Sequence, residues 1–124
     1  MITEDYVSFE IAKLLKEKGF PQSTFRCHYI IDNNINYKSF ENRCGFGDYD
    51  IIAPTLEMAM KWLREVYKIF IEISVSIDLN GNYHYSYFIL NKECKYIRKG
   101  YTDFNWNYEQ ACEAAIKYCL EKLI

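Results

Sequence analysis

The sequence contains few residues that break regular structure, and it has no long hydrophobic run. Only two prolines and five glycines occur among its 124 residues, which excludes collagen-like chains and flexible linkers. Half of the residues are hydrophobic, which excludes an intrinsically disordered chain. Apolar runs such as Ile69–Ile71 end at a charged residue, far short of the about 20 apolar residues that span a bilayer. We therefore expect one globular domain over residues 1–124 and no membrane contact.

Net charge is also small, because 15 basic residues oppose 17 acidic ones and leave a formal charge of −2. A protein that coats nucleic acid would have a strong basic excess, so we expect no general nucleic-acid binding. An acidic mimic of DNA would carry far more negative charge. The first residues, Met1–Asp5, are acidic and contain no apolar segment, which predicts no signal peptide and a cytoplasmic location.

Motifs for metals, phosphates and nucleophilic catalysis are missing. The cysteines never fall in the Cys-x-x-Cys spacing of zinc sites, so we interpret all five as free thiols: Cys27, Cys44, Cys94, Cys112 and Cys119. The glycines of segment 44–50 have neither the Walker nor the dinucleotide-loop spacing. His28 and His84 fall in different predicted hairpins, and no serine or cysteine lies in a nucleophile-elbow motif. We expect no metal, no cofactor and no enzyme activity.

Hydrophobic residues recur at helical spacing in three places, and each place has a helix-start signal. Ser8 precedes an apolar stripe that Gly19 and Pro21 end, which predicts a helix over Ser8–Lys18. Thr55 is the natural N-cap of a second helix after Ala53 and Pro54. A third helix begins at Asn107, where Gln110 completes a capping box. The sequence therefore predicts three helices.

Between the helices lie six segments that are rich in β-branched and aromatic residues. The predicted strands are Thr24–Ile31, Ile35–Phe40, a short one near Tyr49–Ile52, Ile71–Ile77, Tyr83–Asn91 and Cys94–Lys99. The element order is then α-β-β-(β)-α-β-β-β-α. Tight turns between consecutive strands favour antiparallel pairing, so we expect an α+β fold whose helices cover one face of a mostly antiparallel sheet.

The dipeptide Asn80-Gly81 is typical of a two-residue hairpin turn. Such a turn places Ile77 opposite His84, and the apolar side chains of Ile71–Ile77 then form a face against the helices. The other face combines serines and acidic residues with a row of tyrosines. A second tight turn at Lys92-Glu93 extends that face onto the last strand. The predicted site face consists of Tyr83, Tyr85, Tyr87, Tyr96 and Arg98.

Three interpretations of this face stay open. Tyrosines on strands commonly pack against cross-strand neighbours, which would make the face structural. Tyrosine and arginine are also enriched at subunit interfaces, which would make the chain a homo-oligomer. As a ligand face, tyrosine rings would stack on a nucleobase and Arg98 would bind phosphate through its planar fork. The loop residues Arg43, Phe46 and Tyr49 would then close over the ligand.

Three parts of the chain resemble a group of small uncharacterised proteins that are common in phages and prophages of gut bacteria. They are Ser8–Lys13 with Lys18–Phe20, Ala53–Leu56 with Lys61–Val66, and Tyr108–Leu120. The resemblance covers both ends and the second predicted helix, and its motifs are helix starts and core positions. It implies a phage context and a cytoplasmic protein, and it carries over no catalytic residues.

That context suggests a counter-defence role by analogy with other small phage accessory proteins. We expect a non-enzymatic homo-oligomer that binds and sequesters a nucleotide-derived immune signal, such as a cyclic ADP-ribose-type molecule or a cyclic oligonucleotide. The alternative is a protein-binding module that blocks a host or defence protein. It would use the same face or the basic residues Lys61, Arg64 and Lys68 of the second helix. A small enzyme acting on nucleotides is the third interpretation.

Overall fold

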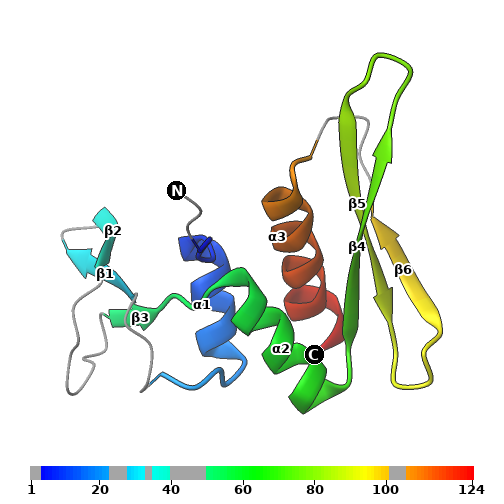
Figure 1. Cartoon of the computed structure of the whole chain (residues 1–124). Helices are drawn as coiled ribbons and strands as arrows, with labels where there is room; N and C mark the ends of the chain where they lie inside the picture. The colour runs from blue at the N-terminus through cyan, green and yellow to red at the C-terminus, as the bar shows by residue number, and fades with distance from the viewer. Residues whose placement is uncertain (1–3, 23–27, 33–34, 40–49, 101–105) are drawn as a thin grey trace. The chain divides into compact units, whose positions relative to one another are not determined.

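A computed structural model describes residues 4–22, 28–32, 35–39, 50–100 and 106–124 (Figure 1). Its elements are α1 (Phe9–Glu17), β1 (His28–Asp32), β2 (Ile35–Ser39), β3 (Asp50–Ile52), α2 (Leu56–Tyr67), β4 (Phe70–Ile77), β5 (Tyr83–Leu90), β6 (Tyr96–Gly100), α3 (Tyr108–Tyr118) and a final π-helical turn, η1 (Cys119–Leu123). The predicted α+β class, the three helices and the order of elements are confirmed.

The chain divides into two compact units, Met1–Ala59 and Met60–Ile124, and the boundary falls within α2. The six strands are shared equally between them, in two three-stranded antiparallel sheets with the orders β2-β1-β3 and β4-β5-β6. Each unit is described by itself below. The expectation of a single domain stays a prediction.

In the first unit, α1 begins and ends where its local signals predict. The Ser8 side chain accepts a hydrogen bond from the backbone N–H of Ile11 at 3.4 Å, which caps the first turn. At the other end Gly19 adopts a φ of +91°, and the N–H of Phe20 donates to the carbonyl of Leu15. This is the Schellman arrangement, in which the buried Phe20 ring returns towards the last turn.

The first unit is held together by contacts between segments far apart in the chain. The Tyr29 hydroxyl donates to the carbonyl of Val7 at 2.8 Å, and its ring meets the edge of Phe9 at 5.4 Å between centroids. The backbone N–H of Ile52 donates to the side-chain oxygen of Gln22. Because buried polar groups need partners, these bonds fix β1 and β3 against the segments that flank α1.

In the second unit, α3 covers one face of the sheet β4-β5-β6, and it contacts β5 most extensively. The Asn107 side chain accepts from the N–H of Gln110, and the Gln110 side chain accepts from the N–H of Asn107, so the predicted capping box is confirmed. The fully buried stripe of the helix and its last turn is Ala111, Cys112, Ala115, Ile116, Cys119 and Leu120. Burial raises the pKa of the Cys119 thiol to about 12, so this cysteine acts as a small apolar residue at neutral pH.

The predicted register of the β4–β5 hairpin is wrong by one residue. Asp78 pairs with Asn82, and the loop between them contains three residues, with Gly81 at a φ of +83°. A two-residue type I′ turn would require a positive φ at Asn80 as well, and Asn80 does not adopt one. The Asp78 carboxylate instead accepts from the N–H groups of Asn80 and Asn82 at 2.8 and 2.9 Å. These bonds stabilise the longer loop, so Ile77 lies opposite Tyr83.

The β5–β6 loop repeats this arrangement. Asn91 accepts from the N–H groups of Glu93 and Lys95 through its side-chain oxygen, at 3.0 and 3.1 Å. Cys94 occupies the position that Gly81 has in the first loop, with a φ of +61°. The predicted tight turn at Lys92-Glu93 is therefore wrong, because the loop contains three residues and Asn91 binds its N–H groups. The pairing of β5 with β6 also has a register shift between Ile89 and Leu90.

Replacing Cys94 with glycine is expected to raise the free energy of unfolding by about 1 kcal/mol, because a left-handed conformation costs roughly that much for a residue with a Cβ atom. The matched control is Glu93→Gly in the same loop, where no positive φ is required and the change is expected to destabilise the protein. Urea denaturation of both variants measures the difference. A Cys94→Gly protein less stable than the wild type would contradict the prediction.

Candidate functional site

The one-residue change in register puts the tyrosines of β5 on the face that α3 covers. Strand side chains alternate between faces, so Tyr83 and Tyr85 lie on the same face as their partners Ile77 and Val75. Tyr85 meets the edge of Tyr108, the first residue of α3, at 6.1 Å between centroids. The prediction of an aromatic face separate from the apolar face is therefore wrong, since a single-residue shift exchanges the faces of a strand.

Tyr87 has a structural role in this arrangement. Its side chain is 4% exposed, and its ring stacks on Trp106 at 6.0 Å with an interplanar angle of 21°. Gly100 is its cross-strand partner, and a Cβ atom at Gly100 would overlap the Tyr87 ring. The ring thus fills the space that the missing side chain leaves, which makes it unavailable to a ligand.

Arg98 is exposed, but its guanidinium already contacts side chains of its own unit. Its guanidinium lies 4.6 Å from the centre of the Tyr118 ring on α3, and it forms a hydrogen bond with the Tyr87 side chain. Both partners belong to the packing between α3 and the sheet. Arg98 therefore joins the sheet to the helix through a cation–π contact, and binding a phosphate would have to compete with that contact.

Tyr96 lies on the opposite face of the sheet from Tyr83, Tyr85, Tyr87 and Arg98. The register shift places it opposite Leu90, beside Phe88, whose ring it meets at 5.3 Å between centroids. A hydrogen bond to Glu72 raises the pKa of its hydroxyl. Lys99 lies over the same Phe88 ring at 5.3 Å. The structure therefore brings Tyr83, Tyr85, Tyr87 and Arg98 to the face that α3 covers and places Tyr96 on the other face. Arg43, Phe46 and Tyr49 lie outside the described residues.

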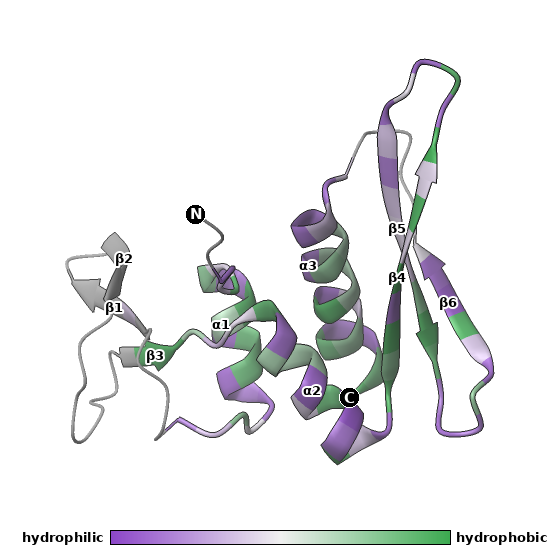
Figure 2. Ribbon diagram, viewed as in Figure 1, coloured by the Kyte–Doolittle hydropathy of each residue, from purple (hydrophilic) through white to green (hydrophobic). Residues whose placement is uncertain are grey.

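A different group of side chains is exposed at the end of the β4–β5 hairpin, which extends past α3 (Figure 1). The exposed fractions are 55% for Val75, 61% for Ile77, 106% for Leu79 and 62% for Tyr83. We refer to these four residues as the hairpin patch. Figure 2 shows hydrophobic and hydrophilic residues alternating along the end of β4 into the loop. The alternation of apolar and polar residues along β4 shows in the sequence which side chains share a face. The length of α3, which only the structure shows, determines which of these apolar side chains stay exposed.

Polar groups border the hairpin patch and fix its shape. The His84 ring nitrogen Nε2 lies 2.8 Å from the Asp78 carboxylate, which also accepts the two loop N–H groups. The predicted register places His84 on the apolar face, but in the structure His84 lies opposite Ser76 on the other face, so that prediction is wrong. The hydrogen bond with His84, followed by those from Asn82 and Asn80, lowers the pKa of Asp78 from 3.8 to about 2.

This pKa shift predicts a pH dependence of stability. Because the folded-state pKa of Asp78 lies below the unfolded-state value, its contribution is fully present above about pH 4 and is lost as the pH falls towards 2. Asp78→Asn should therefore be less stable than the wild type near neutral pH, and the difference should shrink below about pH 4. Urea midpoints across this range measure it. A difference that stays constant down to about pH 2 would assign the effect to another group.

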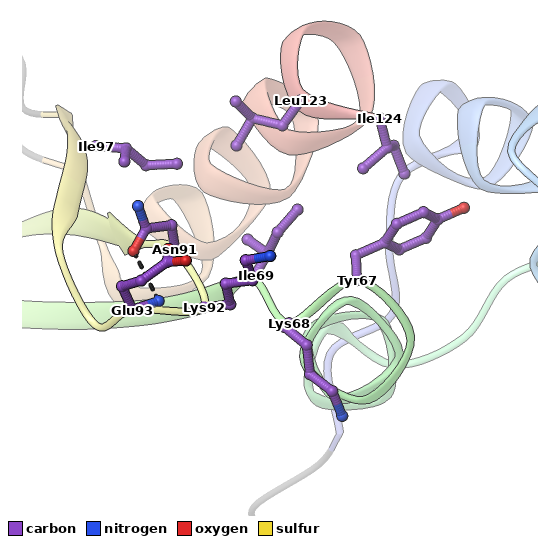
Figure 3. A pocket seen from close by; sticks show the side chains of 9 residues that line it. All are labelled: Tyr67, Lys68, Ile69, Asn91, Lys92, Glu93, Ile97, Leu123 and Ile124. Atoms are coloured by element: carbon purple, nitrogen blue, oxygen red, sulfur yellow. Dashed lines mark hydrogen bonds between the residues drawn. The ribbon is translucent and has the colours of Figure 1, made fainter.

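A pocket of about 290 Å³ lies at the other end of the sheet (Figure 3). Its lining is Tyr67, Lys68, Ile69, Asn91, Lys92, Glu93, Ile97, Leu123 and Ile124. Most of this wall is apolar, and the Lys68 ammonium donates to the carbonyl of Glu65. None of the five predicted site residues that the structure describes lines the pocket. Its ionisable lining residues are Tyr67, Lys68, Lys92 and Glu93.

Within the described parts of the chain, no group of three or more histidine, cysteine, aspartate or glutamate side chains is placed to hold a metal ion. None of the described helices is long and apolar enough to cross a bilayer. The described cysteines are outside any disulfide bond, with Cys94 exposed and Cys112 and Cys119 buried. Comparison of the chain with models of protein families, with curated proteins and with solved structures finds no match.

Proposed function

We propose that this chain is a non-enzymatic binding protein that holds a protein partner through the hairpin patch. The observation that carries the proposal is the exposure of four large apolar side chains next to one another on a single hairpin. Soluble proteins rarely leave such a group uncovered unless it binds something. The neighbouring loop is held by hydrogen bonds from the N–H groups of Asn80 and Asn82 to the Asp78 carboxylate, so the patch is carried by an ordered hairpin.

The biological setting of the proposal rests on the resemblance to small phage and prophage proteins. In that setting the partner is a host or defence protein, the location is the host cytoplasm, and binding counteracts defence. The basic residues Lys61, Arg64 and Lys68 of the α2 region are exposed as well, but they include no large apolar side chain. The hairpin patch is therefore the stronger choice for the interface.

Sequestration of a cyclic nucleotide signal is the competing proposal. It would depend on the exposed rings of Tyr83 and Tyr96, and these lie on opposite faces of the sheet. A single ligand would not stack on both. The Tyr87 ring is buried against Trp106, and the exposed Arg98 guanidinium lies over the Tyr118 ring, so a ligand would have to displace Arg98 from that contact. The geometry therefore favours a protein partner.

Quantitative co-purification from lysate of a gut-bacterial host identifies a stoichiometric partner, and binding to that purified protein is then measured. The double variant Ile77→Ser/Leu79→Ser should weaken binding at least about tenfold, since central apolar contacts dominate interface energies. Val66→Ser is the matched control, because Val66 is 57% exposed on α2 outside the patch. It should leave the affinity unchanged.

Two results would overturn the proposal. The first is equal affinity of the wild type and the double variant for the partner. The second is a stoichiometric gain of ligand mass by native mass spectrometry with a panel of cyclic nucleotides and cyclic ADP-ribose isomers, which would establish the competing proposal. Arg98→Ala would then show whether Arg98 leaves Tyr118 to bind the phosphate.

A further inference from the structure

The strand β4 lies at the edge of its sheet, and its own sequence contains little of the usual protection against pairing. The order β4-β5-β6 leaves one side of β4 without a neighbouring strand among the described residues. Its eight residues include no proline and no lysine, and its pairing with β5 continues without a bulge. Glu72 is its one ionisable residue. Natural edges normally have such protection, because an open row of N–H and C=O groups pairs with another strand.

The hairpin loop determines which backbone groups of β4 point towards the open edge. The N–H of Asp78 donates to the carbonyl of Asn82, so Asp78 points towards β5. Backbone direction alternates along an antiparallel pair, so the even-numbered residues of β4 point towards β5. The backbone N–H and C=O groups of the odd-numbered residues point towards the open edge. These residues are Ile71, Ile73, Val75 and Ile77.

These outward residues are arranged symmetrically about Ser74. Apolar residues occupy the positions one and three before Ser74, and also one and three after it. We propose that two copies of the chain form a dimer by antiparallel pairing of their β4 edges about a two-fold axis at Ser74. Ile73 then lies opposite the partner's Val75, and Ile71 opposite the partner's Ile77. All four outward positions exchange backbone hydrogen bonds, and like apolar side chains lie beside one another.

Charge and length favour this register over its neighbours. A two-fold axis at Val75 would place Glu72 opposite the partner's Asp78, and facing carboxylates are unfavourable. An axis at Ile73 would place the exposed Ile77 opposite the partner's Ile69, which is buried and precedes the strand. The axis at Ser74 pairs Glu72 with the partner's Ser76, so no like charges face each other. It also pairs every residue from Ile71 to Ile77.

This dimer would enlarge the proposed interface without covering it. Edge pairing uses backbone groups, so the side chains of Val75, Ile77 and Tyr83 stay on the face that α3 occupies. The two patches would lie on the same face of one continuous sheet of six strands. The inference rests on the proposed function here, because it makes a partner of the hairpin patch contact two copies of the chain.

Two lysine substitutions on one strand test the register. Ser74 and Ser76 are both exposed on the face opposite α3, so neither change alters the hairpin patch. Ser74→Lys places two ammonium groups opposite each other across the two-fold axis, whereas Ser76→Lys places each beside the partner's Glu72. Light scattering should give twice the 14.9 kDa chain mass for the wild type and for Ser76→Lys. Ser74→Lys should be monomeric or need at least about tenfold more protein to dimerise, since like charges opposed on paired strands are unfavourable.

Disulfide formation gives a second measurement in a background with Cys27, Cys44 and Cys94 replaced by serine. Ser74→Cys puts two thiols at a pair whose Cα atoms are about 4.5 Å apart, within the range of a disulfide. Ser76→Cys instead separates the two thiols by about 13 Å along the strands, which is too far for a disulfide bond. Covalent dimer should therefore form with Ser74→Cys alone.

A wild-type chain that is monomeric at every concentration would overturn the dimer, and so would equal behaviour of the Ser74 and Ser76 variants. The outcomes separate this inference from the proposed function. A monomer that still loses its protein partner on Ile77→Ser/Leu79→Ser would remove the dimer and retain the function. A dimer that the Ser74 variants disrupt, in a protein whose partner binding does not depend on the hairpin patch, would retain the dimer and remove the proposed function.

Discussion

Replacing Gly100 with alanine is expected to lower the free energy of unfolding of the second unit by about 3 kcal/mol, at the upper end of the usual range for overpacking. The added methyl group would overlap the Tyr87 ring. That ring cannot move away easily, because it is buried, stacks on Trp106 and forms a hydrogen bond with Arg98. Either the ring or the β6 backbone must be displaced.

Urea denaturation followed by tryptophan fluorescence measures this effect. A double-mutant cycle identifies its cause, because removing the ring with Tyr87→Ala should abolish most of the extra cost of Gly100→Ala. Gly81→Ala is a control of a different kind, since that site has open space around it but requires a φ of +83°. A Gly100→Ala protein as stable as the wild type would show that the sheet does not need the close approach of Tyr87.

Ile89→Ala is expected to be the most costly of the side-chain truncations on the hairpin. Ile89 is fully buried on the central strand β5, where it lies opposite Ile71 and Arg98. Truncation of a buried isoleucine costs about 2–5 kcal/mol, the sum of lost transfer free energy and the cavity that remains. A loss of this size approaches the whole free energy of unfolding of a small unit. We therefore expect the Ile89→Ala protein to be partly unfolded at room temperature.

Ile77→Ala is the matched control for this prediction. It is the same substitution on the same face of the same hairpin, but Ile77 is 61% exposed. Its cost should stay within about 0.5 kcal/mol, as for other surface substitutions. Thermal or urea unfolding of the two variants provides the comparison. If both cost the same, the end of the hairpin would be as well covered as its base, and the hairpin patch would not be a free surface.

The helices could be predicted because each of their signals is local. Ser8, Thr55 and Asn107 accept hydrogen bonds from N–H groups three residues later, so the cap and its helix lie within one short segment. Gly19 ends α1 for an equally local reason, its positive φ. The strands follow from their composition and alternation. These features are visible in the sequence because no distant contact is needed to produce them.

The sheet register could not be predicted with the same success. Asn80-Gly81 is compatible with a two-residue turn and also with a three-residue loop that ends at Gly81. The deciding factor is the Asp78 carboxylate, which binds the loop N–H groups and His84. The alternation of β4 fixes which residues share a face, but the choice between faces depends on the loop. The predicted site contains the same error, because its five strand residues are assigned to a face by register alone.

The two hairpin loops of the second unit have a consequence for how that unit folds. Each loop is stabilised by its own first residue, Asp78 or Asn91, so each hairpin has a source of stability within its own sequence. The three strands also follow one another in the chain, and every strand pair joins residues close in sequence. Low sequence separation between contacts favours rapid folding. The sheet therefore has the local contacts that favour early formation, whereas the burial of Tyr87 and Ile89 depends on the later segment α3.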